Sequence, residues 1–165
     1  MSIFKANDIR GRYGTELLNR DAYSLGRAFV IFLNRKNPSV VIGRDMRLSS
    51  PALSESLIQG LVDQGADVLD IGLVDSPGLA FATAYLRRPG IMITASHNPK
   101  EDNGFYLSLE NGDTISKQNG LESIEKIMKN SQSQYNVPKK GRVLNTSISR
   151  AYQKHVLSFI NPNNI

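Results

Sequence analysis

Apolar residues recur along this chain in two patterns, and the two patterns alternate. Short apolar runs typical of buried strands occupy residues 40–43, 67–71 and 90–94. Elsewhere apolar residues return every three or four positions, which predicts helices over residues 22–36, from Ser50-Pro51 to Gly65 and from Ser76-Pro77 to Arg87. Strands that alternate with helices through short links form parallel sheets with right-handed crossovers. The pattern predicts an α/β domain of three layers around a mixed, mostly parallel sheet.

The predicted helices carry signals at their ends. Asp21 precedes the first helix as a candidate N-cap, and Ser50-Pro51 and Ser76-Pro77 each place a small polar residue before a proline of the first turn. Gly65 suits the left-handed position that commonly ends a helix. These signals set the predicted helix boundaries.

The pattern changes after residue 100. Phe105, Leu107 and Leu109 alternate with polar residues, which predicts a half-exposed strand. The Asn111-Gly112 pair that follows is a strong hairpin-turn signal.

The remaining sequence is more polar. Ser116 is expected to cap a helix that runs to about Lys129, residues 131–143 are expected to form a connector, and residues 147–160 predict a last amphipathic helix. We therefore divide the chain into a domain at residues 1–130 and, at residues 131–165, a connector and helix that lead toward an absent second domain.

Composition narrows the class of protein. The chain has 165 residues, 40% of them hydrophobic, which fits one domain with a real core. No segment approaches the roughly 18 apolar residues of a membrane span, and the N-terminus lacks the layout of a signal peptide. We expect a cytoplasmic protein without a membrane partner. The absence of cysteine excludes disulfides and cysteine-bound zinc.

The chain carries a formal charge of +5, with a pI near 9.6. A positive surface attracts anions, which include both phosphosugars and nucleic acids. The basic residues are dispersed except for the cluster Lys139-Lys140-Gly141-Arg142. A solvated basic surface explains the charge equally well, and no motif supports nucleic-acid binding.

Candidate chemistry gathers where the predicted parallel strands end. Their following loops begin at Gly43, Gly72 and Thr94, and the carboxyl ends of parallel strands share one edge of a sheet. This places Arg44, Arg47, Ser96 and His97 in one region. Because guanidinium groups pair with phosphate oxygens, a hydroxyl among arginines suits phosphate chemistry.

Ser96 alone is weak evidence of catalysis. A Ser-His-Asn-Pro turn can simply bond its own backbone. The chain has no Gly-x-Ser-x-Gly elbow, so an α/β-hydrolase has little support.

The longer block around Ser96 resembles a known family. Residues 94–99 read TASHNP and are followed by Asn103-Gly104-Phe105, which together resemble the phosphoserine loop of the α-D-phosphohexomutases, the phosphomannomutases and phosphoglucomutases. Residues 4–11, which end in Asp-Ile-Arg-Gly, and residues 41–49 resemble further motifs of that family in the same order. The resemblance covers roughly residues 3–115, and residues 152–160 resemble the passage into the family's second domain.

The resemblance implies roles for individual residues. Ser96 would carry the phosphoryl group, and Arg10 would lie beside that group. His97 would flank the reacting hydroxyls, as a proton carrier or as a residue that orders the loop. Tyr106 and Arg44 are the candidates for substrate binding, although Arg44, like its neighbours Asp45 and Arg47, is expected rather to brace the loop edge. His155, on the last helix, is expected to be structural or exposed.

Two features of the family are missing. Its second domain holds Mg²⁺ with an Asp-x-Asp-x-Asp run and a phosphoserine oxygen, whereas this chain has no Asp-x-Asp pair and could offer only the phosphate of Ser96. We therefore expect the first domain alone, inactive by itself. The family also commonly places a proton-transferring lysine where this chain has Tyr106, so we expect Tyr106 to face the site and the proton carrier to lie elsewhere.

The resemblance implies reversible phosphoryl transfer between O1 and O6 of a glucose or mannose phosphate, through a hexose 1,6-bisphosphate and with Mg²⁺. A glucosamine-phosphate mutase is disfavoured by the TASHNP form. Two other classes remain open: a non-catalytic sugar-phosphate-binding or regulatory module of the same fold, and a nucleic-acid-binding domain suggested only by charge.

Overall fold

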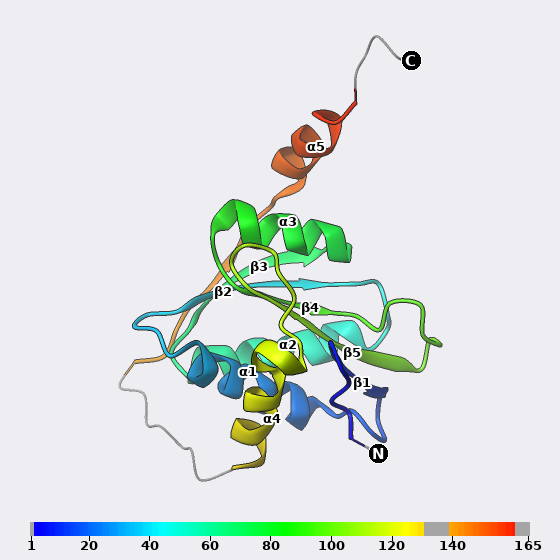
Figure 1. Ribbon diagram of the computed structural model, residues 1–165, viewed down its shortest axis with the longest axis vertical. Coiled ribbons are helices and arrows are strands. Elements are labelled where there is room, and N and C mark those ends of the chain that lie inside the picture. Colours follow the sequence, from blue (N-terminus) through cyan, green and yellow to red (C-terminus); the bar gives the residue numbers. More distant parts are fainter. Residues whose placement is uncertain (1, 131–138, 161–165) are drawn as a thin grey trace.

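The structure is a computed structural model that describes residues 2–130 and 139–160 (Figure 1). Its strands are β1 (Ile9–Arg12), β2 (Ser39–Arg44), β3 (Asp67–Leu73), β4 (Gly90–Ile93), β5 (Asp102–Ser108) and β6 (Val143–Asn145). Its helices are α1 (Asn19–Leu33), α2 (Ser50–Asp63), α3 (Ser76–Leu86), α4 (Glu122–Lys129) and α5 (Ser149–Leu157), with a π-helical turn, η1 (Lys117–Leu121), before α4. No helix among the described residues combines the length and apolar character that crossing a membrane requires.

The strands form one sheet in the order β1-β5-β4-β2-β3-β6. β2 pairs in parallel with both β3 and β4, and β6 pairs in parallel with β3. β5 runs antiparallel to its two neighbours, β4 and β1. The prediction of a mixed, mostly parallel sheet is therefore confirmed. The central strand β2 is buried on both faces, as its continuous apolar run requires.

Helices cover both faces of the sheet and enclose two hydrophobic cores. Figure 1 shows α1, α2 and α4 on one face and α3 on the other, with α5 projecting beyond α3. The larger core lies under α1, α2 and α4 and includes Leu25, Phe29, Leu57 and Phe105. The smaller core lies under α3 and includes Val41, Leu79 and Met92. The predicted three-layer architecture is confirmed.

The first helix is shifted from its predicted position. α1 begins at Asn19, and Asp21 lies inside its first turn, where its carboxylate accepts the backbone N–H of Leu18 at 2.8 Å. Asp21 is therefore the third residue of the helix, and its side chain bonds the main chain of the N-cap residue. Its prediction as N-cap is wrong. The helix stops at Leu33 because Asn34 adopts a left-handed conformation with a φ of 46°.

The next two helices begin near the predicted Ser-Pro pairs, with different caps. Ser49, and not the predicted Ser50, occupies the N-cap position of α2. The hydroxyl of Ser50 donates to a carboxylate oxygen of Asp45 at 2.6 Å. Asp75 caps α3 by accepting the N–H of Gly78 at 2.7 Å. Gly65 follows α2 with a φ of 91°, so its predicted role at the helix end is confirmed.

The strand predicted as half-exposed is an internal strand. β5 begins at Asp102 and lies between β1 and β4, and most of its residues are buried on both faces. The alternation misled because Ser108 is a buried polar residue whose hydroxyl contacts the main-chain oxygens of Leu109 and Asp113. The predicted turn at Asn111-Gly112 does form, since Ser108 bridges to Thr114 across it.

The C-terminal segments hold a strand that the sequence did not indicate. Residues 143–145 form β6, although Val143 was predicted to lie in a connector; residues 131–138 of that connector lie outside the described residues. Before it, Ser116 caps η1 as expected, and Gly120, with a φ of 156°, interrupts the helical backbone within η1. The last predicted helix is present as α5.

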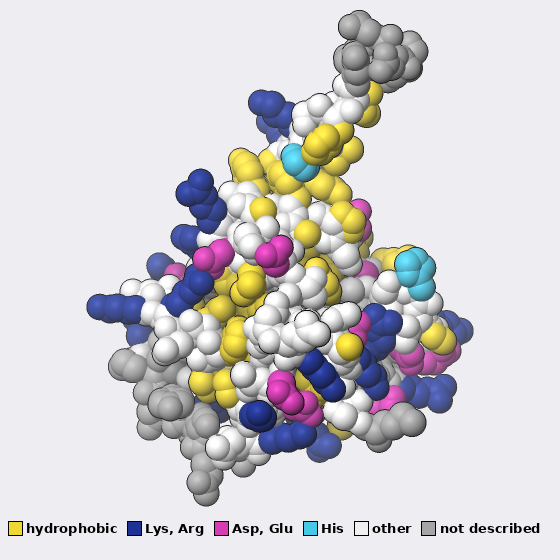
Figure 2. Space-filling view, in the orientation of Figure 1, with side chains coloured by type: hydrophobic (Ala, Val, Ile, Leu, Met, Phe, Trp, Pro, Cys, Tyr) yellow, Lys and Arg dark blue, Asp and Glu magenta, His cyan; other side chains and the backbone are white. Residues whose placement is uncertain are grey.

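α5 packs on α3 through aromatic rings and leaves a hollow beside them. The ring of Phe81 lies 5.4 Å from that of Tyr152 and 4.8 Å from that of the exposed His155, consistent with a structural or exposed role for the histidine. Exposed apolar side chains continue from the outer end of this helix to the residues beyond it, where Phe159 is 75% exposed (Figure 2).

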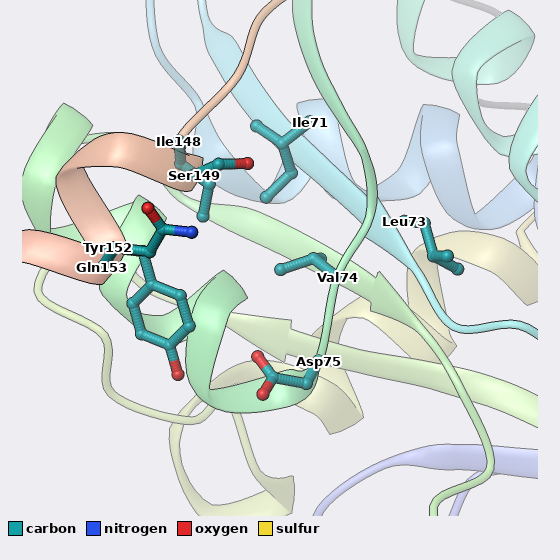
Figure 3. A pocket seen from close by; sticks show the side chains of 8 residues that line it. All are labelled: Ile71, Leu73, Val74, Asp75, Ile148, Ser149, Tyr152 and Gln153. Atoms are coloured by element: carbon teal, nitrogen blue, oxygen red, sulfur yellow. The ribbon is translucent and has the colours of Figure 1, made fainter. Parts of the chain in front are cut away.

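The hollow has a volume of about 400 Å³ and opens between α5, the end of β3 and the start of α3 (Figure 3). Tyr152 and Asp75 both lie at its wall. Burial, and to a smaller extent the negative charge of Asp75, raises the pKa of the Tyr152 hydroxyl.

α1 and α2 cross at two glycines. A Cβ atom on Gly26 would lie 2.4 Å from the carbonyl oxygen of Leu57, and one on Gly60 would lie 2.1 Å from that of Tyr23. No side chain fits at these distances. The two helices therefore contact each other through main-chain atoms, with no side chain of either glycine between them.

We predict that Gly60→Ala lowers the free energy of unfolding by about 1–3 kcal/mol, because the added methyl group pushes the two helix backbones apart. Urea denaturation measures the loss. Ser56→Ala, on the same helix, removes only a hydroxyl that bonds the carbonyl of Ala52 and serves as the control. Equal stability of the two variants would contradict the predicted close contact.

Candidate active site

Ser96 lies in the loop between β4 and β5, at the edge of the sheet where the parallel strands end. It is exposed and adopts a φ of 54°, a left-handed conformation that residues with a side chain rarely take. Its N–H donates to the hydroxyl of Thr94 at 2.9 Å. The strained backbone turns an exposed hydroxyl outward at the sheet edge, a feature that clusters at functional sites.

His97 contacts the hydroxyl of Ser96 directly. Oγ of Ser96 lies 2.9 Å from Nδ1 of His97, and both side chains are exposed. This single hydrogen bond suits either predicted role, because it orders the loop and also gives the serine proton an acceptor.

Arg10 reaches the same loop from β1. Its Nη1 donates to Oδ1 of Asn98 at 2.6 Å, Nη2 pairs with the carboxylate of Asp8, and Nε is buried without a partner among the described residues. The strand lies close to β5 because its partner there is Gly104, where a Cβ would come within 2.2 Å of the carbonyl oxygen of Ile9.

Ser96, Arg10 and Tyr106 share one hollow. Its volume is about 370 Å³, and it is lined also by Asp8, Ser76, Pro77, Ala80 and Thr94. Tyr106 points to the face of β5 opposite Phe105 and Leu107 and packs toward α3, as predicted from the alternation. Its hydroxyl makes a 2.6 Å hydrogen bond with the hydroxyl of Thr114.

Arg44 is separate from this hollow. It ends β2, is half-buried, and is not among the described residues that line the cavity of Ser96 and Arg10. Its assignment to substrate binding stays a prediction.

Arg47 holds the loop, which confirms its predicted bracing role. Nη1 donates to the carbonyls of Pro99 (2.6 Å) and Asp102 (3.0 Å), and Nη2 donates to those of Ser96 (2.9 Å) and Asn98 (2.8 Å). The sequence indicated the region, and only the folded chain shows that one side chain contacts four carbonyls.

A buried polar network ties this arginine to the sheet. Asp45 pairs with Nε of Arg47 at 3.2 Å and accepts the hydroxyl of Ser50. Asn103, fully buried at the start of β5, donates to the hydroxyls of Ser49 and Ser50 at 2.7 and 3.0 Å. Sequence reasoning missed the role of Asn103, because its signal, an asparagine before Gly104 and Phe105, marks the motif without revealing a partner.

A second hollow of about 650 Å³ lies on the other side of Ser96. Met46 and Leu48 stand at its wall, 81% and 100% exposed. The serine thus stands between the hollow that it shares with Arg10 and a larger one lined by Met46 and Leu48.

The described residues do not provide a metal centre. Among residues 2–130 and 139–160, no group of three or more His, Cys, Asp or Glu side chains could hold a metal ion. The Mg²⁺ that the resemblance implies therefore fits no ligand set in this part of the chain, which offers Ser96 alone.

Comparison with known families matches residues 1–135 to the description "Phosphoglucomutase/phosphomannomutase, alpha/beta/alpha domain I". The chain belongs to the phosphoglucomutase/phosphomannomutase family. It is 40% identical over 166 residues to a phosphomannomutase of Vibrio cholerae. The matched region covers 98% of this chain and 36% of that protein. A phosphomannomutase of Klebsiella pneumoniae is 45% identical over 133 residues, 80% of this chain and 83% of its own length.

The fold has solved counterparts in the same family. The crystal structure of a phosphoglucomutase/phosphomannomutase family protein from Burkholderia thailandensis superimposes with a TM-score of 0.83 at 32% identity, covering 96% of this chain and 36% of that one. The chain thus spans about 36% of the length of several of its relatives, which agrees with domain I of a phosphohexomutase.

We predict that Ser96→Gly is more stable than Ser96→Ala by up to about 1 kcal/mol, because only glycine adopts a left-handed conformation without strain. Position 56, in the regular helix α2, should show the opposite order, with Ala above Gly by about 1 kcal/mol. Urea denaturation of the four variants compares the two positions. The same order at both would show that Ser96 is not held in a left-handed conformation.

Proposed function

We propose that this chain is the phosphoryl-carrying domain of a phosphohexomutase that acts on glucose or mannose phosphate. The observation that carries the proposal is Ser96: an exposed hydroxyl on a strained turn, at the sheet edge, in one hollow with the guanidinium of Arg10. A cation beside a nucleophilic oxygen stabilises the charge that develops on a transferring phosphoryl group. Family membership supports the substrate class.

The proposed reaction exchanges one phosphate ester for another. Phosphorylated Ser96 transfers its group to the free hydroxyl of the hexose monophosphate: a bond from phosphorus to the sugar oxygen forms, and the bond to Oγ breaks. The sugar hydroxyl gives up its proton, and Oγ regains one. The resulting hexose 1,6-bisphosphate reorients and returns its other phosphate to Ser96, so the number of phosphate groups is conserved.

His97 and Arg10 take different parts in this scheme. Nδ1 of His97, 2.9 Å from Oγ, can give a proton to the serine oxygen as it leaves and take it back when the serine attacks. Arg10, which lines the same hollow as Ser96, offers the charge of its guanidinium to the phosphoryl group. Because the described residues hold no group of three or more His, Cys, Asp or Glu side chains that could bind a metal, Mg²⁺ would take its other ligands from outside them.

A second candidate is a non-catalytic module that binds sugar phosphates. Tyr106 favours it, since this position commonly holds a lysine in the family and its hydroxyl here bonds Thr114. A phenol, with a reference pKa of about 10, is a poor base at neutral pH. Catalysis then needs another proton carrier, for which His97 is the candidate.

We predict that phosphate on Ser96 is required for mutase activity. In a chimaera in which residues 1–160 replace the aligned segment of the Vibrio cholerae phosphomannomutase, glucose 1,6-bisphosphate should phosphorylate Ser96, and Ser96→Ala should reduce turnover to background. Phosphopeptide mapping and a coupled assay with glucose 1-phosphate measure both. The 165 residues alone should not turn over substrate, because one open domain cannot enclose a site.

Ser56→Ala is the matched control and should keep full activity. Circular dichroism of each variant shows whether the chimaera is folded. A folded chimaera that carries phosphate on another residue, or none on Ser96, would refute the assignment. Robust conversion by the 165 residues alone would show that this domain suffices.

We predict that His97 rather than Tyr106 moves the proton. In the same chimaera, His97→Ala should lower kcat/KM by about 10²- to 10⁴-fold, the usual contribution of general acid–base catalysis. Tyr106→Phe should have a small effect, and Tyr106→Lys should restore the common residue of the family. If Tyr106→Phe removes activity while His97→Ala leaves it unchanged, the tyrosine is the proton carrier.

A further inference from the structure

Both terminal nitrogens of the Arg47 guanidinium are occupied by the loop backbone. An arginine offers five N–H groups. Its Nε faces the carboxylate of Asp45, and its two terminal nitrogens make four hydrogen bonds to carbonyls of residues 96–102. The four terminal N–H donors are thus used by main-chain carbonyls, and Nε forms an ion pair with a carboxylate. Although Arg47 lies beside Ser96, it is therefore unsuited to bind a substrate phosphate.

Four carbonyls accept hydrogen bonds from this one cation, and the carbonyl of Pro99 also accepts the N–H of Asp102. The four carbonyls come from Ser96, Asn98, Pro99 and Asp102, so the chain folds round the guanidinium within seven residues. Hydrogen bonds from a charged donor are stronger than neutral ones, and acceptors left without a partner cost free energy. The side chain is only 11% exposed, so water replaces these bonds poorly.

These contacts fix the main chain of Ser96 while its hydroxyl faces the site. The serine N–H is bound by Thr94, and its carbonyl is bound by Arg47. Both sides of a left-handed residue are thus held, which offsets the strain of its φ. Oγ, in contrast, contacts only the exposed ring of His97 among the described residues.

We propose that Arg47 is a positioning residue for phosphoryl transfer: it acts through the loop backbone to hold Oγ of Ser96 toward Arg10, without touching the sugar phosphate. The proposal rests on the proposed function of Ser96. Because a misplacement of about 1 Å costs about 10²-fold in rate, a loose loop slows transfer although the nucleophile remains. Asp45, in the loop after β2, pairs with the arginine, and Asn103 of β5 bonds Ser50, which in turn donates to Asp45.

Hydrogen exchange of the 165-residue chain tests the loop without relying on activity. Lysine at position 47 keeps the positive charge, but its single ammonium group cannot reproduce the planar arrangement of N–H donors of the guanidinium. Arg47→Lys should accelerate exchange of the Asn98 and Asp102 amides, which bond within the loop, by about tenfold or more, while β2 amides stay protected. Arg88→Lys, which alters an exposed arginine bound to one carbonyl, should change nothing there. Unchanged loop exchange in Arg47→Lys overturns the proposal.

Kinetics of the chimaera test the catalytic part. Arg47→Lys should lower kcat by about 10²-fold and leave KM for glucose 1-phosphate within about twofold. Arg47→Ala should regain activity when guanidinium ion is added below denaturing concentrations, since the free ion can reoccupy the ring of carbonyls. A raised KM with unchanged kcat would make Arg47 a substrate-binding residue and overturn the proposal, as would a loosened loop with normal kcat.

The two proposals fail in distinguishable ways. If the chimaera with native Arg47 carries no phosphate on Ser96, the proposed function fails. The exchange experiment still decides whether Arg47 holds the loop, because it measures no chemistry.

Discussion

The structure depends on the burial of one strand, β2, between two parallel neighbours. Val40, Val41 and Ile42 are inaccessible to solvent, because α1 and α2 cover one face of the sheet and α3 covers the other. Pairing on both sides fixes the register of β3 and β4, so their carboxyl ends reach the same edge. Arg44, Arg47 and Ser96 lie at or near that edge because the core fixes the alignment of these three strands.

The edge itself is held by different forces from the core. Inside the sheet, main-chain groups pair with one another; in the Ser96 loop, the carbonyls turn inward to a single guanidinium. The loop can thus hold a left-handed serine without belonging to a strand or a helix. A polar support of this kind fixes the geometry of the loop without burying apolar surface. Functional and strained sites of this type are where proteins most often depart from the local rules of folding.

The sequence predicted those parts of the fold that depend on local pattern. The buried strands at residues 40–43, 67–71 and 90–94, the three long helices and the edge shared by Arg47 and Ser96 follow from periodicity and parallel topology. Three features did not follow. β6 has only three exposed residues, the buried Ser108 breaks the alternation of β5, and Arg47 acts on carbonyls 49 to 55 residues away. The pairing of β6 with β3 and the contacts of Arg47 join distant segments, which no local pattern records.

The pairing of β6 with β3 has a consequence for synthesis on the ribosome. Val68 pairs with Val143, so the outer edge of β3 has no partner until the chain has been made beyond Asn145. An open edge of this kind is a template for pairing between molecules. A nascent or shortened chain that stops at residue 135, where the match to domain I ends, would already contain the serine loop and both glycine contacts. It would still present an unpaired strand, and ten further residues would decide whether it stays soluble or self-associates.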